Sequence, residues 1–142
     1  MITLLSLFLF LAANAPVSLD QVKAEVNPEH RARLAIDYAT AAERNAEQAY
    51  DKGDMSVVTA ELKNVLESFE TAQASFDAAH KTPGRNPGPF KYAEVHSREL
   101  LIRLNDLEQK MDVNERPAIE PVRARIQQLH DVWFEGIMGR KK

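Results

Sequence analysis

Residues 55–80 read MSVVTAELKNVLESFETAQASFDAAH and carry the most regular apolar pattern of the chain. Its apolar residues recur at alternating steps of four and three: Val58, Leu62, Val65, Phe69, Ala72, Phe76 and Ala79. This spacing keeps one apolar stripe on one side of an α-helix for about six turns. The stretch therefore predicts a long amphipathic helix whose stripe must be covered by other helices.

Three neighbouring segments show helical spacing as well. The stripe of residues 90–111 consists of Ala93, Ser97, Leu100, Leu104, Leu107 and Met111, and Leu101 and Ile102 widen it. The stripe of residues 115–138 consists of Ile119, Val122, Ile126, Leu129, Trp133 and Ile137. In residues 28–51 one face is formed by Leu34, Tyr38, Ala42, Ala46 and Ala49. Each segment is long enough to form one side of a helical bundle.

Capping residues, glycine and proline mark the ends of these helices. Asn27 and Pro28 are typical of a helix start, Gly53 of a helix stop, and Asp54 of the next start. The segment 81–89 contains three prolines and two glycines, which exclude a helix.

Two further helix starts are indicated by capping boxes. In a capping box, a capping side chain is followed three residues later by Gln or Glu. Ser18 and Gln21 predict a short leading helix. Asp112 and Glu115 predict the start of the last helix, and Pro121 should offset its first turn.

We therefore expect an all-α fold, an antiparallel four-helix bundle made of two helical hairpins with a short leading helix. No stretch of useful length alternates with the period of two that a strand requires. The bundle should span residues 16–139, with helices at about 28–51, 55–80, 90–111 and 115–138.

Charge divides the chain into two halves of opposite sign. Residues 16–80 carry 12 acids and 6 bases, and residues 81–142 carry 9 acids and 12 bases. This difference should help the two hairpins dock, and a dipolar surface for a partner is the alternative interpretation. The net charge of −3 gives no general attraction to nucleic acid, so we expect no nucleic-acid partner.

Residues 1–15, MITLLSLFLFLAANA, have the apolar centre and the small-residue end of a signal peptide. We expect an exported protein, periplasmic or secreted, and most consistent with a bacterial envelope. The missing positive charge before the apolar run and Pro16 after it leave an uncleaved anchor as the alternative. The run is far shorter than the roughly 20 residues of a spanning helix, so no stable transmembrane span is expected. Residues 140–142 form a basic tail.

Signatures of enzymes and metal centres are absent from the sequence. It lacks cysteine, a glycine-rich phosphate loop, Gly-x-Ser-x-Gly, His-Glu-x-x-His and the Glu-x-x-His of di-iron bundles. The four histidines fall on different helices, although His30 and His80 are placed to share one end of the bundle. We therefore expect no enzyme, no catalytic residue, no metal site and no cofactor.

The best candidate site is the segment 81–91. No acid occurs from residue 78 to residue 93, whereas Lys81, Arg85 and Lys91 supply positive charge. Free amides at the start of the following helix should point to the same region. These three side chains are the candidate anion-binding residues, and an ordinary solvated linker is the alternative.

Residues 49–54, AYDKGD, resemble the turn between the helices of a tetratricopeptide repeat. The predicted helices are roughly twice as long as that family's, and no self-similarity at the family's spacing of about 34 residues appears. The whole chain loosely resembles small uncharacterised secreted helical proteins of bacteria, a resemblance that implies no activity.

The sequence favours a non-enzymatic exported bundle that binds an envelope protein or an anionic envelope component. The alternative is a carrier of a small ligand or a metal, in the bundle core or at the basic loop 81–91. No pattern in the sequence indicates an oligomeric state.

Overall fold

The computed structural model describes residues 18–139. It contains α1 (Leu19–Lys23), α2 (Pro28–Asp51), α3 (Met55–Ala78), α4 (Pro87–Lys110), the 3-10 turn η1 (Arg116–Ala118) and α5 (Glu120–Met138). No strand occurs in this part of the chain. The expected all-α bundle of two hairpins with a short leading helix is confirmed. The predicted signal peptide at 1–15 and the basic tail at 140–142 lie outside the described residues.

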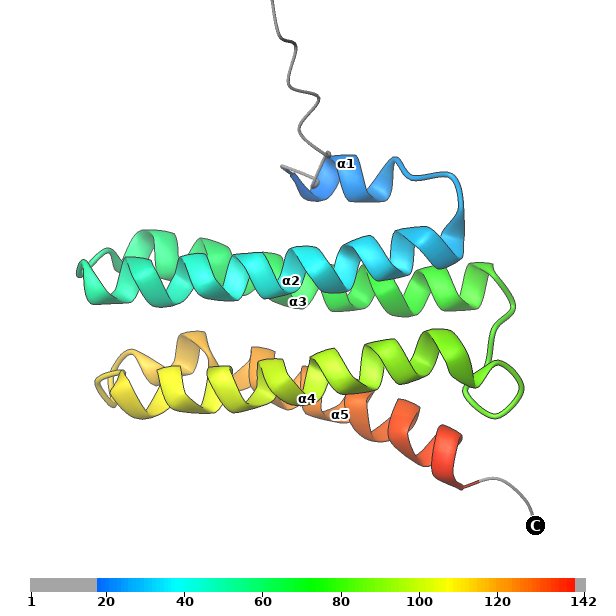
Figure 1. Ribbon diagram of the computed structural model, residues 1–142. Helices are drawn as coiled ribbons and strands as arrows, with labels where there is room; N and C mark the ends of the chain where they lie inside the picture. The colour runs from blue at the N-terminus through cyan, green and yellow to red at the C-terminus, as the bar shows by residue number, and fades with distance from the viewer. Residues whose placement is uncertain (1–17, 140–142) are drawn as a thin grey trace, which may run out of the picture.

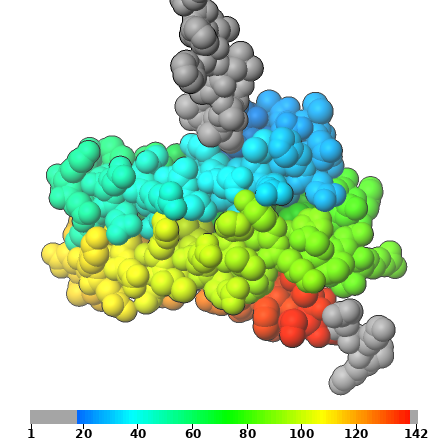
Figure 2. Space-filling view, in the orientation of Figure 1, coloured from blue at the N-terminus to red at the C-terminus, as the bar shows by residue number. Residues whose placement is uncertain are grey.

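The two hairpins, α2–α3 and α4–α5, pack side by side (Figure 1). Between the hairpins α2 lies beside α4 and α3 beside α5, while α1 rests on α2 and α3. Because chain direction alternates, α2 and α4 run the same way, and Figure 2 shows them along one face of the molecule. The starts of α2 and α4 therefore meet the end of α3 at one end of the bundle.

The apolar stripes read from the sequence form most of the core. The α3 stripe from Val58 to Phe76 is at most 1% exposed, and the stripes of α4 and α5 are buried as well. Ile102 is 60% exposed, so the expectation that it widens the α4 stripe is wrong. It lies two residues from Leu104, about 200° around the helix, and so points to solvent.

The stripe of α2 is shifted from the expected one. Ala42, Ala46 and Ala49 are buried as expected, but Leu34 and Tyr38 lie only half-buried at its edge. The centre of the stripe is instead formed by Ala32, Ala35, Ile36 and Ala39. Since α2 contacts α1, α3 and α4, small side chains at its centre allow close helix approach.

The α2–α3 turn has the geometry that its sequence predicts. Gly53 adopts a positive φ of 75°. The amide of Asp54 donates to the carbonyl oxygen of Ala49 at 2.9 Å, which closes α2 in a Schellman motif. The Asp54 carboxylate then accepts from the amide of Val57 at 3.2 Å and caps α3.

The end of α3 has the same geometry without a glycine. The amide of Lys81 donates to the carbonyl oxygen of Phe76 at 3.0 Å, and His80 takes the left-handed position with φ 55°. A side chain at that φ costs about 1–2 kcal/mol. His80 is exposed, so its ring offers little packing in return.

We predict that His80→Gly raises the free energy of unfolding by about 1 kcal/mol, because glycine adopts this φ without strain. Urea unfolding of both proteins measures the difference. Gly53→Ala makes the opposite change at the matching position of α2 and should lower stability by a similar amount. Changes of the same sign in the free energy of unfolding of both variants would contradict this explanation.

Two helix starts differ from the sequence expectation. Helix α4 begins at Pro87 rather than at 90, and α5 begins at Glu120 rather than at 115. The predicted capping box before α5 is absent, since the Glu115 amide donates to the carbonyl oxygen of Asp112 in a turn. A start at Glu120 keeps Pro121 in the first turn, where its missing N–H does no harm.

Ion pairs connect the acidic first hairpin to the basic second one. Arg125 Nε lies 2.5 Å from Glu70 Oε1, and Lys110 Nζ lies 3.4 Å from Glu47 Oε1 and 3.3 Å from Asp51 Oδ1. In each pair the acid comes from the first hairpin and the base from the second. This supports docking as the role of the charge division, although exposed pairs contribute only about 0–1 kcal/mol each.

The connection between α3 and α4 is held against α5. Its Asn86 amide donates to the carbonyl oxygen of Thr82 at 2.8 Å. A Cβ atom at Gly136 of α5 would come within 2.6 Å of Pro83 Cβ, so only glycine allows this approach. The proline-rich segment is therefore a packed part of the bundle.

None of the helices in residues 18–139 is both long and apolar enough to cross a bilayer.

Candidate functional site

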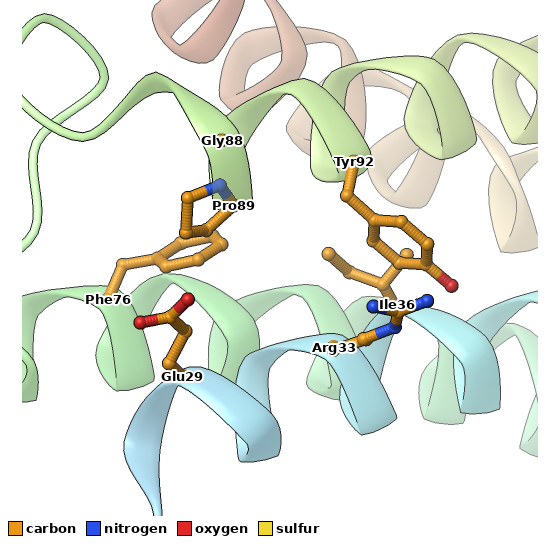
Figure 3. Close-up of a pocket in the computed structure, with 7 residues that line it drawn as sticks. All are labelled: Glu29, Arg33, Ile36, Phe76, Gly88, Pro89 and Tyr92. Atoms are coloured by element: carbon orange, nitrogen blue, oxygen red, sulfur yellow. The ribbon is translucent and has the colours of Figure 1, made fainter.

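A hollow of about 280 Å³ lies where α2 and α4 begin, beside the end of α3. We call it the first hollow. Its lining residues, drawn in Figure 3, are Glu29, Arg33, Ile36, Phe76, Gly88, Pro89 and Tyr92. The volume is close to the lower end of the range of about 300–1,000 Å³ for small-ligand pockets.

Helical spacing explains how distant residues meet in the first hollow. Glu29, Arg33 and Ile36 are four and three residues apart, so they share one face of α2. Pro89 and Tyr92 are three apart on the first turns of α4. Figure 3 shows Phe76 of α3 facing Pro89, with Tyr92 on the other side of the space.

The floor of the first hollow is apolar and firmly packed. Ile36 and Phe76 are each 1% exposed. The Phe76 ring lies 4.2 Å from the ring of Phe90 and 5.9 Å, edge to face, from that of Trp133, measured between ring centroids. Such aromatic contacts hold the floor in place before any ligand arrives.

On the side of Tyr92, the first hollow is bounded by polar side chains that stack on one another. The Arg33 guanidinium carbon lies 4.4 Å from the centroid of the Tyr92 ring, and the His96 ring lies 4.1 Å away on the same tyrosine. The Tyr92 hydroxyl donates a hydrogen bond to Asp37. Burial, together with this bond, raises the pKa of Tyr92 above its usual value, so the phenol stays protonated.

Arg33 shares a side-chain hydrogen bond with Tyr92 and keeps its other N–H donors for a ligand. Within residues 18–139 no carboxylate lies within 4.0 Å of its guanidinium, whose contact is with Tyr92. A guanidinium has five N–H donors and stays charged in proteins. Arg33 is therefore the cation that the first hollow offers to a negatively charged group.

The predicted anion-binding residues do not line this hollow. Lys81 Nζ lies 3.8 Å from Glu29 Oε2 on its rim, a partner that the acid-free stretch of sequence does not reveal. Arg85 and Lys91 are exposed, and neither forms an ion pair within residues 18–139. An anion site of Lys81, Arg85 and Lys91 stays a prediction.

The start of α4 offers fewer amides than expected. Pro87 and Pro89 occupy the first and third positions of the helix and have no N–H. Only Gly88 retains a free amide among these three positions. This weakens the helix-end contribution to an anion site at the loop.

Two of the four histidines, His130 and His30, contact a residue outside their own helix. His130 Nε2 lies 3.2 Å from Glu94 Oε1 of α4, and its Nδ1 lies 3.2 Å from Asp131 Oδ1. His30 Nδ1 lies 3.3 Å from Glu25 Oε2. In the described part of the chain no three His, Asp or Glu side chains are grouped so that they could hold a metal ion.

Comparison of the chain with protein-family models, with curated proteins and with solved structures finds no match. The resemblances noted in the sequence therefore stay expectations. A proposal of function must rest on the side chains of the bundle itself.

Proposed function

We propose that this chain is a non-enzymatic binding protein that takes a small amphipathic molecule in the first hollow, with an apolar body and a single carboxylate or similar anionic head. The observation that carries the proposal is Arg33, a cation without a carboxylate partner at the edge of an apolar floor. This develops the carrier alternative of the sequence and places the ligand where the edge of the core, at Ile36 and Phe76, meets the end of the basic loop, at Gly88 and Pro89.

The two parts of such a ligand would be held by different forces. Its apolar body would lie against Ile36, Phe76 and Pro89. Since Ile36 and Phe76 are only 1% exposed, most of the gain of about 25 cal/mol per Å² would come from the ligand's own apolar surface leaving water. Its head would accept charge-assisted hydrogen bonds from Arg33. Glu29, negatively charged on the rim, would disfavour a head with more than one negative charge.

Arg33 and Tyr92 of the first hollow suit binding better than catalysis. Arg33 does not exchange its proton in proteins, and the raised pKa of Tyr92 keeps that phenol from acting as a base near neutral pH. Neither group is thus poised near the working pH, as a general acid or base should be.

We predict that Arg33→Gln weakens binding of an aryl monocarboxylate, phenylacetate for example, by about 10-fold or more, since a hydrogen bond to a charged group contributes about 1.5–3 kcal/mol. Chemical-shift titration of the ¹⁵N-labelled protein measures the dissociation constant and locates the probe. The alcohol 2-phenylethanol should bind both proteins equally, since it lacks the charge.

Lys91→Gln is the matched control, because it removes an exposed cation that does not line the first hollow. It should leave phenylacetate binding unchanged. Equal binding of phenylacetate by the parent and by Arg33→Gln, or shifts centred on Lys91 instead of on Tyr92, would refute the proposal.

A protein or envelope partner, and export itself, stay predictions. A surface for a partner is supported by exposed apolar side chains on the second hairpin. They include Ile102, Phe134 and Met138, which are 60%, 44% and 64% exposed. Their presence is compatible with a bundle that carries a small ligand to a partner.

A further inference from the structure

A second hollow of about 200 Å³ opens further along the seam between α2 and α4. Its lining residues are Asp37, Thr40, Arg44, His96, Glu99, Leu100 and Arg103. Tyr92 lines the first hollow and Asp37 lines the second, and the hydrogen bond between these two side chains separates the hollows. Unlike the first, the second hollow is lined mostly by ionisable side chains.

The two arginines of the second hollow have unused donors. Within residues 18–139, Arg44 has no carboxylate within 4.0 Å, and Arg103 has one, Glu43 Oε2, at 3.7 Å from its Nη1. That distance exceeds a normal hydrogen bond. Two acids share the lining. Asp37 accepts a hydrogen bond from Tyr92, and Glu99 Oε2 lies 3.9 Å from His96 Nδ1 on a side chain that is 65% exposed.

Directly behind Arg103 lies a carboxyl group in an unusual setting. Glu43 is fully buried, and neither of its oxygens has a hydrogen-bond partner within the described residues. A buried charge without hydrogen bonds is unfavourable, and groups of this kind call for a physical explanation. Arg103, itself 40% exposed by its side chain, is the counter-charge nearest to it.

We propose that the second hollow binds a small oxyanion between Arg44 and Arg103, and that binding draws a proton onto Glu43. The anion would take the free donors of both guanidinium groups and offset the charge of Arg103. Glu43 would then lose its counter-charge and gain a negative neighbour, so its carboxylate would accept a proton from the solvent. Anion affinity must consequently increase as the pH falls.

Other charged groups act on Glu43 in known directions. Burial raises its pKa above the usual value, Glu47 raises it further, and Arg103 and Arg44 lower it. Within residues 18–139 no charged group of α3 is among these influences. His96 lines the same hollow, and its own protonation would also favour an anion at low pH, so it needs a separate control.

Sulfate is the suitable probe, because it is an oxyanion that does not titrate between about pH 5 and pH 8. Chemical-shift titration at several pH values gives its dissociation constant, with chloride at matched ionic strength as the reference. Arg44→Gln should weaken sulfate binding about 10-fold or more. Lys63→Gln, which removes an exposed cation on α3, should leave it unchanged.

The coupling to Glu43 is tested by comparing pH profiles. In the parent and in His96→Gln, sulfate should bind more tightly as the pH is lowered. When Glu43→Gln is added to His96→Gln, this dependence should be lost while binding remains, and in Glu43→Gln alone it should be reduced. Sulfate shifts absent from the lining of the second hollow, or an unchanged pH profile in Glu43→Gln, would overturn the proposal. Neither outcome bears on phenylacetate binding in the first hollow.

Discussion

Replacing Phe69 by alanine is expected to lower the free energy of unfolding by about 3–5 kcal/mol. Phe69 lies at the middle of the α3 stripe, is fully buried, and stacks on Trp133 of α5 with ring centroids 5.9 Å apart. Its ring therefore joins the two hairpins. Alanine would leave a cavity between the hairpins. The cavity cannot close, because α3 and α5 are fixed by the packing of their other buried residues along the whole length of both helices.

Urea or thermal unfolding measures the loss, and Phe134→Ala provides the control. Phe134 carries the same ring on α5 but is 44% exposed, so its replacement should change stability by less than about 1 kcal/mol. A loss below about 1 kcal/mol for Phe69→Ala would mean that the bundle does not close around the α3 stripe.

The second large effect should have the opposite sign. We expect Glu43→Leu to raise the free energy of unfolding at neutral pH by about 1–4 kcal/mol, the gain seen when buried charges are replaced by apolar residues. Leucine fills a similar space and needs no hydrogen bond. Arg103 remains half in solvent, so the change leaves no buried charge behind.

The gain should depend on pH in a defined direction. Because burial raises the pKa of Glu43, its ionised form is less favourable in the folded protein than in the unfolded chain. The contribution of Glu43 to the free energy of unfolding is therefore fully present at a pH below the ordinary pKa of glutamate. It is lost as the pH rises through the raised pKa of the folded protein. The advantage of Glu43→Leu should thus grow from acid to neutral pH.

Unfolding experiments at several pH values measure this difference directly. Glu47→Leu is the control, since the side chain of Glu47 on the same helix is 43% exposed and its replacement should show no comparable gain. An advantage of Glu43→Leu that does not change with pH would show that its benefit comes from packing alone.

A stabilising substitution at Glu43 would also be informative about function. Natural proteins retain unfavourable buried groups where activity needs them, and their removal then raises stability at the expense of function. If the second hollow binds an oxyanion as proposed, the stabilised variant should bind sulfate with a weaker pH dependence than the parent.

Local sequence patterns were sufficient for the helices and most of their buried faces. The stripes of α3, α4 and α5 were readable because each repeats with the helical period over many turns. The α2 stripe was harder to read, since alanines lie on several sides of that helix and apolar spacing alone does not select among them. The start of α5 was missed because Pro121, rather than the capping box at Asp112, decides where that helix begins.

The candidate site could not be assembled in the same way. The sequence pointed to Lys81, Arg85 and Lys91 because no acid is near them along the chain, yet the fold places Glu29 beside Lys81. Arg33 carried no signal, since a single arginine on a polar helix face is common. Glu43 was one of many acids in the first half, and no pattern marked it as buried.

By itself, therefore, the sequence determined the all-α class, the two hairpins and the stripes of the core, because these depend on helix period, capping and turn residues that act over a few positions. Only the tertiary structure decided that the hairpins meet with α2 and α4 side by side and parallel. That contact joins residues some 55 positions apart, such as Asp37 and Tyr92, and creates both hollows. Its register depends on how whole faces fit together, which no local spacing records.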